Sequence, residues 1–299
     1  MNTLVVLLGP TGVGKTELSL CLAEHLNTSI INADSRQIFA EIPIGTAAPT
    51  LEQQQRVKHH FVGTLHLNDY YSAAKYEEDV LDLLQHHFSP TRHVALLSGG
   101  SMMYIDAVCS GIDDIPTVND SIRDWMMHRL QTEGLSALVD ELRKLDPEHY
   151  DCVDKHNPRR VVHALEICHL TGKPYSAFRK HTKKQRPFRI IKIGLNRPRE
   201  EMYERINNRV HDMMQQGLLE EAERVFPLRG LNSLNTVGYR ELFSYFDGNI
   251  SLEDAVLKIQ SNSRQYMRKQ LTWAKRDSEI RWFVPTNIEE IINYIDSQL

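Results

Sequence analysis

Residues 9–16 constrain the fold of this chain more than any other stretch. They read Gly-Pro-Thr-Gly-Val-Gly-Lys-Thr and follow the apolar run Leu-Val-Val-Leu-Leu at 4–8. Glycines at 9 and 14 let the backbone curl, so that its N–H groups and the start of the next helix face an anion. The pattern predicts a phosphate-binding P-loop between a buried parallel strand and a helix. The candidate phosphate ligands are Gly9, Pro10, Thr11, Gly12, Val13, Gly14, Lys15 and Thr16.

Both flanks of this loop favour the P-loop over a chance glycine turn. Leu18, Leu22 and Leu26 recur at helical spacing after it, as expected for a helix with one buried face. Lys15 would add a positive charge at the phosphates, and Thr16 would offer its hydroxyl to Mg²⁺. The loop alone leaves the identity of the phosphate compound open.

Polar residues follow two further predicted strands, at 29–33 and 94–98. The first is followed by Asp34, Ser35, Arg36 and Gln37, which should lie at the same sheet edge as the P-loop. Asp34 is a candidate base or metal partner, with an Asx turn as the alternative. The second strand ends in Ser98 and paired glycines, whereas P-loop ATPases often have an aspartate there, and this difference disfavours a motor or GTPase. Ser101, just after the glycines, would face the cleft, with a plain tight turn as the alternative.

The order of elements predicts an α/β fold, a P-loop NTPase-like parallel sheet flanked by helices, with a mostly helical insertion domain. Strand patterns occupy 189–195 and 280–284, whereas 119–182 is predicted as several short helices. We therefore expect a catalytic core domain at 1–115 and 187–299, and an insertion domain at 116–186. Residues 42–49 are expected to form a loop. His59 and His60 are interpreted as packing residues, because two histidines next to each other in sequence point to different sides and make a poor metal site.

A basic segment stands out against the net charge of −4. From Lys155 to Lys192 there are eleven Lys or Arg residues and one acid, Glu166. Such a segment suits a surface that binds a polyanion, because neutralising phosphates releases counterions. A solvated basic loop is the alternative.

Composition favours a cytoplasmic protein. The N-terminal apolar run is five residues long, too short for a signal peptide core or a membrane span. The four cysteines have no paired spacing, which disfavours a disulfide framework or a zinc ribbon.

The ordered set of motifs resembles the tRNA dimethylallyltransferase family, also called tRNA isopentenyltransferases, over nearly the whole chain. Besides the P-loop, the set includes Asp-Ser-Arg-Gln at 34–37, Ile-Gly-Thr-Ala-Ala-Pro at 44–49 and Gly-Gly-Ser-Met-Met-Tyr at 99–104. It continues with Asn-Pro-Arg-Arg-Val-Val-His-Ala-Leu-Glu at 157–166, Gly-Leu-Asn-Arg-Pro-Arg-Glu-Glu at 194–201, Val-Gly-Tyr-Arg-Glu at 237–241 and Gln-Leu-Thr-Trp at 270–273.

The resemblance implies transfer of a dimethylallyl group from dimethylallyl diphosphate to the N6 amine of the adenosine just 3′ of a tRNA anticodon, position 37. It implies that the P-loop binds the diphosphate together with Mg²⁺, with Thr16 as the metal ligand. Asp34 matches the family's general base, and the implied catalytic set is Asp34, Thr11, Lys15 and Arg209. A weak nucleophile such as an aromatic amine needs a stabilised leaving group, which fits this set.

The same resemblance implies tRNA contacts and a monomeric enzyme without membrane attachment. The implied contact residues are Asp34, Ser35, Arg36, Gln37, Ser101, Arg123, Arg159, Arg160, Val161, Val162 and His163. Three positions depart from the family pattern, since Ser101 replaces a threonine, His163 an arginine and Ala48 a frequent lysine.

Three other functions remain as competitors. An isopentenyltransferase acting on free adenylate would keep the P-loop and Asp34 but need little RNA surface. A small-molecule P-loop kinase would share the first strand, loop and helix but would have no need of the basic segment. An RNA-binding protein with a relict P-loop is disfavoured by the intact Lys15, Thr16 and Asp34.

Overall fold

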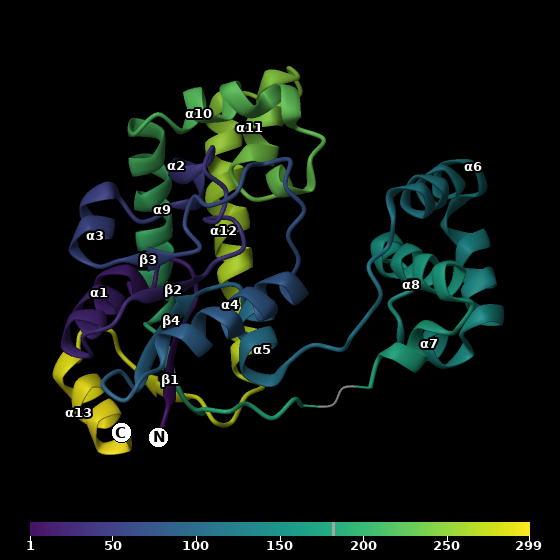
Figure 1. Cartoon of the computed structure of the whole chain (residues 1–299). Helices are drawn as coiled ribbons and strands as arrows, with labels where there is room; N and C mark the ends of the chain where they lie inside the picture. Colours follow the sequence, from purple (N-terminus) through teal and green to yellow (C-terminus); the bar gives the residue numbers. More distant parts are fainter. Residues whose placement is uncertain (181–182) are drawn as a thin grey trace. The chain divides into compact units, whose positions relative to one another are not determined.

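The chain folds into two compact units (Figure 1). The computed structural model describes residues 1–180 and 183–299. The first unit, the core unit, comprises Met1–Cys109 and Gln185–Leu299, and the second, the helical unit, comprises Ser110–Lys184. The boundaries predicted from the sequence, after 115 and 186, lie a few residues further on. His181 and Thr182, which it includes in the helical insertion, lie outside the described residues.

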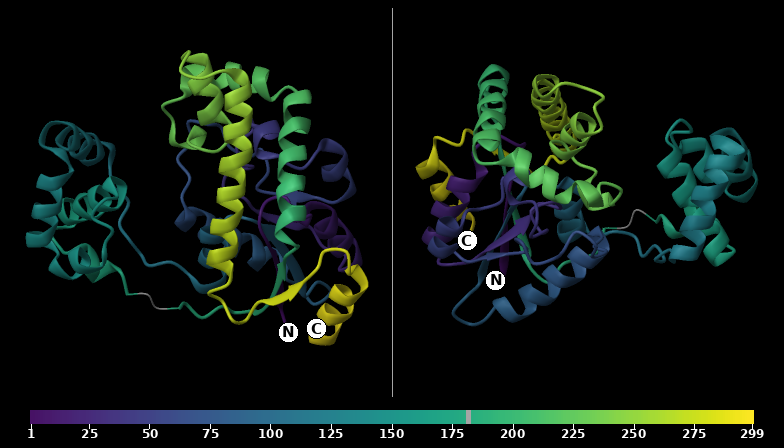
Figure 2. Two further views of the ribbon diagram at one scale, coloured as in Figure 1. Left: turned by 180° about the vertical axis from the view of Figure 1, so that it is seen from behind. Right: turned by 90° about the horizontal axis from the view of Figure 1, so that it is seen from above.

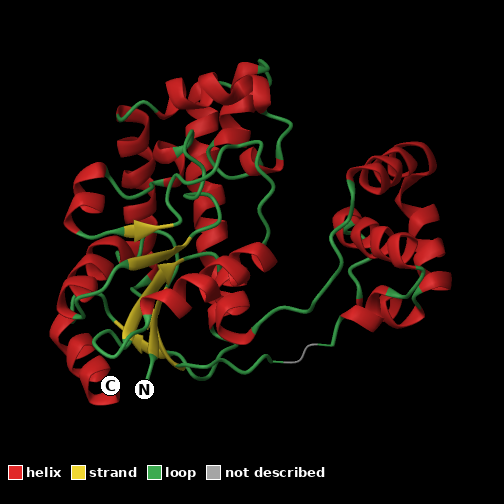
Figure 3. Cartoon of the chain, in the orientation of Figure 1, coloured by secondary structure: helices red, strands yellow, loops and turns green. Residues whose placement is uncertain are grey.

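A six-stranded parallel sheet forms the centre of the core unit (Figure 3). The strand order is β3-β2-β4-β1-β5-β6, and every neighbouring pair runs parallel. The strands are β1 (Thr3–Leu8), β2 (Ile30–Ala33), β3 (His59–His60), β4 (Val94–Gly99), β5 (Arg189–Leu195) and β6 (Arg281–Phe283). This arrangement confirms the predicted α/β fold, and it puts β1 with its P-loop between β4 and β5.

Helices cover both faces of this sheet, as its apolar strands require. Alternate residues of β1 point to opposite faces, so Val5 and Leu7 pack with one set of helices and Leu4 and Val6 with the other. The first face carries α1 (Lys15–His25), α9 (Arg199–Gln215) and α13 (Ile288–Gln298). The second carries α4 (Ala73–His87), which Ser72 caps, and α5 (Met102–Ser110).

A third apolar cluster joins the later helices of the core unit. It contains residues of α9, α10 (Leu218–Val225), α11 (Tyr239–Phe246) and α12 (Leu252–Ala274). Figures 1 and 2 show α9 and α12 side by side. Two one-turn 3₁₀ helices, Phe226–Leu228 and Asn232–Leu234, lie between α10 and α11. Ser251 caps the N-terminus of α12.

Two short features of the core unit differ from the sequence prediction. The expected loop at 42–49 contains one helical turn, α2 (Pro43–Thr46), and α3 (Leu51–Arg56) follows it. His59 and His60 form the edge strand β3 beside β2, and His60 Nε2 lies 3.1 Å from Ser29 Oγ. A two-residue strand leaves no period-2 pattern to detect in the sequence.

The helical unit is built from α6 (Asp120–Leu145), α7 (Pro147–Cys152), α8 (Pro158–Thr171) and a 3₁₀ turn, Tyr175–Phe178. Its own core brings together apolar residues of α6 and α8, including Met126, Leu138 and Leu165. Gly134, with φ of 81°, interrupts the helical backbone inside α6. Among the described residues of both units, no helix combines the length and apolarity needed to cross a membrane.

The basic segment from Lys155 to Lys192 is divided between the units, so the prediction of one basic surface is wrong at its C-terminal end. Arg186 is buried in the core unit and donates to Glu77 at 2.7 Å. Lys192 is also buried and pairs with Asp277 and Glu279. Arg186 and Lys192 therefore pair with carboxylates of the core unit and do not belong to a polyanion-binding surface.

Candidate active site

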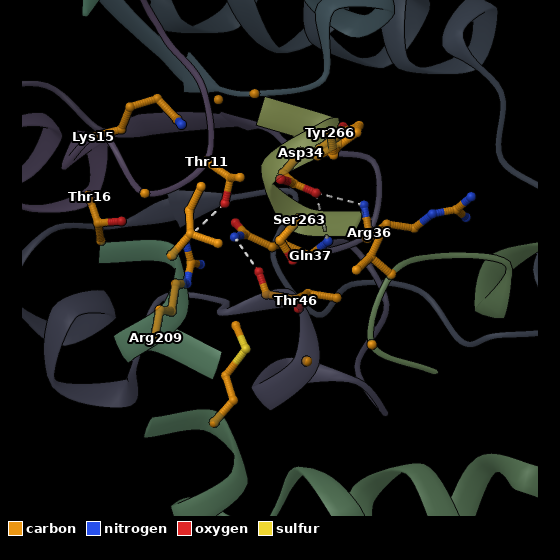
Figure 4. A pocket seen from close by; sticks show the side chains of 18 of the residues that line it. Thr11, Lys15, Thr16, Asp34, Arg36, Gln37, Thr46, Arg209, Ser263 and Tyr266 are labelled. Carbon is orange, nitrogen blue, oxygen red and sulfur yellow. Dashed lines mark hydrogen bonds between the residues drawn. The ribbon is translucent and has the colours of Figure 1, made fainter. Parts of the chain in front are cut away.

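A cavity of about 820 Å³ opens at the carboxyl ends of β1, β2 and β4. The P-loop, residues 34–37, the end of β4, and residues of α2, α9 and α12 all contribute to its lining. Figure 4 shows Thr11, Lys15, Asp34, Gln37 and Arg209 gathered around this cavity. The structure therefore brings the four implied catalytic residues together from three separate segments of the chain.

The P-loop begins at β1 and ends at the first turn of α1. Gly14, the residue before α1, has φ of 105°, a left-handed value that favours glycine. Gly9 has a different role from the one expected, because a Cβ there would come within 3.1 Å of Leu195 O. The curl of the loop thus depends on Gly12 and Gly14, both at positive φ, and Gly9 allows the close approach of β5.

Lys15 is folded back onto the loop. Its Nζ donates to the carbonyl oxygens of Gly9 at 2.8 Å and Pro10 at 2.9 Å. Burial, together with the nearby positive charge of Arg209, lowers the pKa of Lys15 to about 7, against a smaller raising effect of Asp34. An anion that replaced the carbonyl contacts would favour the charged form of this lysine.

Arginines of the β5–α9 segment hold the other side of the P-loop. Arg209 Nη1 donates to Thr11 Oγ1 at 3.1 Å, and Arg205 Nε donates to Gly12 O at 2.8 Å. Arg197 Nε donates to Val13 O at 2.9 Å. Arg205 and Arg209, four positions apart on α9, thus both lie against the P-loop. Burial lowers the pKa of Arg209. Guanidinium groups nevertheless keep their proton in proteins, so Arg209 is a positive charge beside the loop.

Gln270 of α12 holds the P-loop to the end of β4, a role that was not predicted from the sequence. Its Oε1 accepts from the backbone N–H of Thr11 at 2.9 Å, and its Nε2 donates to Gly100 O at 2.8 Å. The side chain is 5% exposed. A Cβ on Gly100 would come within 2.6 Å of Gln270 Nε2, so the glycine after β4 makes room for this amide. The Gln-Leu-Thr-Trp motif was the only sequence signal for this residue.

Asp34 forms the Asx turn that the sequence offers as the alternative, and it also lines the cavity, while its role as a base stays a prediction. Its Oδ1 accepts from the backbone N–H groups of Arg36 at 2.9 Å and Gln37 at 3.4 Å (Figure 4). Among the described residues, none donates a hydrogen bond to Oδ2 of Asp34. One carboxylate oxygen thus holds the turn, and the other is left for a ligand.

Ser101 lies behind the cavity and is absent from its lining in the described part of the chain. It is 8% exposed, accepts from the N–H of Ser35 at 2.9 Å and donates to Ser35 Oγ at 3.1 Å. The Ser101 hydroxyl thus holds the segment that carries Asp34, and it also hydrogen-bonds with Tyr266, which lines the cavity. A contact of Ser101 with RNA stays a prediction.

The remaining predicted RNA contacts lie in the helical unit, at the start of α6 and α8. Arg159, Arg160 and His163 are exposed. Arg123 is half-buried, and its Nη1 lies 3.9 Å from Asp120 Oδ1. Val161 and Val162 are buried in the core of this unit, so their side chains support α8 and offer no surface to RNA. This unit has twelve basic and twelve acidic residues, but eleven of the acids precede Lys155, whereas Lys155 and seven further bases make up the basic C-terminal part.

A metal site in this cavity would need oxygen atoms from a ligand. The described residues contain no cluster of three or more His, Cys, Asp or Glu side chains suited to a metal ion. Thr16 lines the cavity, and no described residue uses its hydroxyl in a hydrogen bond. Mg²⁺ commonly binds through one or two protein oxygens, substrate phosphates and water, so the residues present fit this ion with a bound diphosphate.

Comparisons with known proteins agree on one family. The model of the family described as IPP transferase matches residues 37–277. A tRNA dimethylallyltransferase 1 from Phocaeicola vulgatus is 62% identical over 99% of this chain and 98% of its own length. One from Bacteroides fragilis is 60% identical over 100% and 99% of the two chains.

Solved structures show the same fold. The tRNA isopentenylpyrophosphate transferase of Bacillus halodurans superposes with a TM-score of 0.72 at 33% identity, covering 99% of this chain and 96% of that one. The corresponding enzyme of Staphylococcus epidermidis gives 0.70 at 28% identity and covers both chains fully.

Proposed function

The chain belongs to the IPP transferase family, and we propose that it transfers a dimethylallyl group from dimethylallyl diphosphate to the N6 amine of the adenosine 3′ of a tRNA anticodon. The observation that carries the proposal is the shared cavity of the P-loop and Asp34. A site that binds a diphosphate and presents a carboxylate beside it suits the alkylation of a weak nucleophile. The products would be N6-(dimethylallyl)adenosine and diphosphate.

The P-loop side of the cavity is suited to hold the leaving group. Lys15, the backbone N–H groups of the loop and the start of α1 would bind the diphosphate oxygens. Arg209, which contacts Thr11, would add a second positive charge where negative charge develops as the allylic C–O bond breaks. The electron pair of that bond leaves with the diphosphate.

Asp34 is suited to act as the general base. The N6 lone pair forms the new bond to the allylic carbon, and the amine then carries a surplus proton. Oδ2 of Asp34, which no described residue occupies, can accept this proton while Oδ1 keeps the turn in place. Adenosine must leave its stack in the anticodon loop to reach this cavity, as in other enzymes that act on a base.

Thr16 and the diphosphate would together hold Mg²⁺. When bound, the ion neutralises charge on the leaving diphosphate and so lowers the barrier to breaking the C–O bond. The protein's part is to present the Thr16 hydroxyl at the start of α1 next to the phosphate-binding N–H groups.

The helical unit is proposed to bind tRNA through Arg123, Arg159, Arg160 and His163, together with Asp34, Ser35, Arg36 and Gln37 of the core unit. The charge asymmetry along the helical unit supports this role, because its C-terminal part is strongly basic. We further propose that the chain acts in the cytoplasm as a monomer, since a single chain supplies Thr11, Lys15, Asp34 and Arg209, the full implied catalytic set.

Label transfer tests this function. Purified protein is incubated with Mg²⁺ and radioactive dimethylallyl diphosphate, and with either unmodified tRNA or free AMP. We expect label in tRNA alone. Label in AMP alone would favour the adenylate enzyme, and label in neither would contradict the assignment.

A further inference from the structure

Glu221 of α10 is fully buried, yet the mechanism does not use it. Its Oε2 accepts from the backbone N–H of Ile44 at 2.9 Å, and its Oε1 accepts from the N–H of Gly45 at 2.8 Å. Both N–H groups belong to the single turn α2, which is too short to satisfy them itself. No described lysine or arginine pairs with this carboxylate, so charge-assisted hydrogen bonds alone offset its burial.

Tyr239 of α11 completes this contact. Its hydroxyl donates to Glu221 Oε1 at 2.5 Å, and its side chain is also fully buried. Burial and the adjacent Glu221 carboxylate raise the pKa of Tyr239, so the phenol stays a donor. Gly45 is required here, because a Cβ would come within 2.4 Å of the Tyr239 hydroxyl. Residues from α10 and α11 thus hold the N-terminal end of α2.

Gln37 holds the other end of the same turn. Its Nε2 donates to Thr46 O and to Ala47 O, each at 3.0 Å (Figure 4 shows the first of these bonds). An amide nitrogen has two hydrogens, and both are used here. The amide therefore cannot flip without placing its oxygen against two carbonyls. Its Oε1 has no donor among the described residues, and Gln37 lines the cavity.

Asp34 and Gln37 belong to the same turn, because the backbone N–H of Gln37 donates to Asp34 Oδ1. The turn therefore offers two acceptors, Asp34 Oδ2 and Gln37 Oε1. The N6 amine of adenine has two N–H groups, whereas a base with a carbonyl at C6 presents only an acceptor there. A fixed Gln37 Oε1 next to Asp34 favours the amine and repels the carbonyl.

We propose that Glu221 is a positioning residue that, with Tyr239, holds α2 and thereby keeps Gln37 Oε1 turned toward the acceptor base. The contact between Gln37 Oε1 and the base then selects a 6-amino purine over a 6-oxo purine. The inference rests on the proposed function, since it concerns the base that enters this cavity.

The test compares binding of two anticodon stem-loop RNAs, one with adenosine and one with inosine at position 37. Binding is measured without dimethylallyl diphosphate, so the result does not depend on catalysis. We expect the wild-type chain to bind the adenosine RNA roughly tenfold more tightly, as expected for one hydrogen bond that is replaced by a repulsive contact. We expect Glu221→Gln to bring the ratio close to one, with the KM for dimethylallyl diphosphate unchanged.

Glu223→Gln is the matched control, because Glu223 is an exposed residue on the same helix and should keep the wild-type ratio. Tyr239→Phe, which removes one donor and keeps the ring, should give an intermediate ratio. It also carries the test if Glu221→Gln fails to fold. A folded variant of either kind that keeps the wild-type ratio would overturn the inference.

Gln37→Met separates this role from a general loss of stability. If Glu221 and Tyr239 act through Gln37, the ratio for the Gln37→Met and Tyr239→Phe double variant should equal that of Gln37→Met alone, whereas independent effects would multiply. Equal binding of both RNAs by a wild-type chain that transfers label to tRNA would refute the inference and leave the proposed function intact. Failure of that transfer would refute the function instead.

Discussion

Gln270 accepts a hydrogen bond from the backbone N–H of Thr11 at 2.9 Å, although 259 positions separate the two residues. The same side chain donates to Gly100, so it joins the P-loop to the end of β4. Two of the segments that bear the site are thereby fixed to each other by a helix from the last third of the chain. We therefore expect the geometry of the P-loop, the proposed diphosphate site, to depend on this contact.

Replacing Gln270 with leucine should disturb the P-loop. The substitution leaves the Thr11 N–H and the Gly100 carbonyl without this partner, which costs about 1–3 kcal/mol for each buried group. We expect kcat/KM for dimethylallyl diphosphate to fall tenfold or more, in a chain that still folds. Steady-state kinetics check this, with Gln265→Leu as the control because Gln265 is an exposed glutamine on the same helix. Equal kinetics for the two variants would exclude a role for the contact.

The lowered pKa of Lys15 predicts that diphosphate binding depends on pH. Its pKa is about 7 in the free protein, below its ordinary value of 10.5, so the lysine is mostly neutral at pH 8. A bound diphosphate favours the charged form, hence binding should take up a proton, and affinity should fall as the pH rises above about 7. Calorimetry at pH 8 in buffers of different ionisation enthalpy measures this uptake. Lys15→Met provides the baseline, and identical uptake in both proteins would contradict the prediction.

The same shift affects folding stability with a defined sign. Between about pH 7 and 10.5 the unfolded chain binds a proton at Lys15 that the folded chain does not. The free energy of unfolding contributed by this residue should therefore rise with pH across that window. Urea unfolding at pH 7.5 and 9.5, for the wild type and Lys15→Met, isolates the contribution.

Arg186 should affect stability and not RNA binding. Its guanidinium is buried against Glu77 and the carbonyl oxygens of Ala107 and Val108. Arg186→Met leaves a buried carboxylate without this cation, and we expect a loss of about 3–5 kcal/mol in the free energy of unfolding. Urea unfolding measures the loss. The double variant Arg186→Met and Glu77→Gln should regain part of the stability, because it no longer buries an unpaired carboxylate. A large drop in tRNA affinity of the folded variant would instead place Arg186 at the RNA.

Arg159 and Arg160 should contribute to tRNA affinity through phosphates. Replacing both with alanine should weaken binding and reduce the slope of log K against log salt by roughly one to two. Filter binding between low and moderate salt measures the slope. Lys144→Ala is the control, since it removes an exposed charge from the more acidic part of the helical unit. An unchanged slope in the double variant would mean that the two arginines face away from RNA.

Local sequence patterns predicted the elements that local physics determines. The apolar runs at 4–8, 94–98 and 189–195 form β1, β4 and β5, because strands covered on both faces need continuous apolar residues. Contacts between distant segments could not be predicted in this way. The Gln270 contact with Thr11 and the burial of Arg186 depend on how helices pack, and nothing in the neighbouring residues indicates them.

Motif matching had a similar limit. Val161 and Val162 lie within a motif that resembles an RNA-contact segment, but on α8 they face the core of the helical unit. Ser101 follows two glycines at a strand end, yet its hydroxyl is taken by Ser35. A motif identifies a segment, and only the helix face or the hydrogen-bond partners decide which of its side chains reach a ligand.

The most direct test of the account is the site of modification in tRNA treated with wild-type protein and with Asp34→Asn. Asparagine keeps the shape of the side chain and an oxygen for the turn, but it cannot take the N6 proton. Nuclease digestion and mass spectrometry should find one added dimethylallyl group, on the adenosine 3′ of the anticodon, in the wild-type sample alone. Tight tRNA binding by Asp34→Asn should persist. Near-normal modification by that variant, or modification at another nucleotide, would contradict the account.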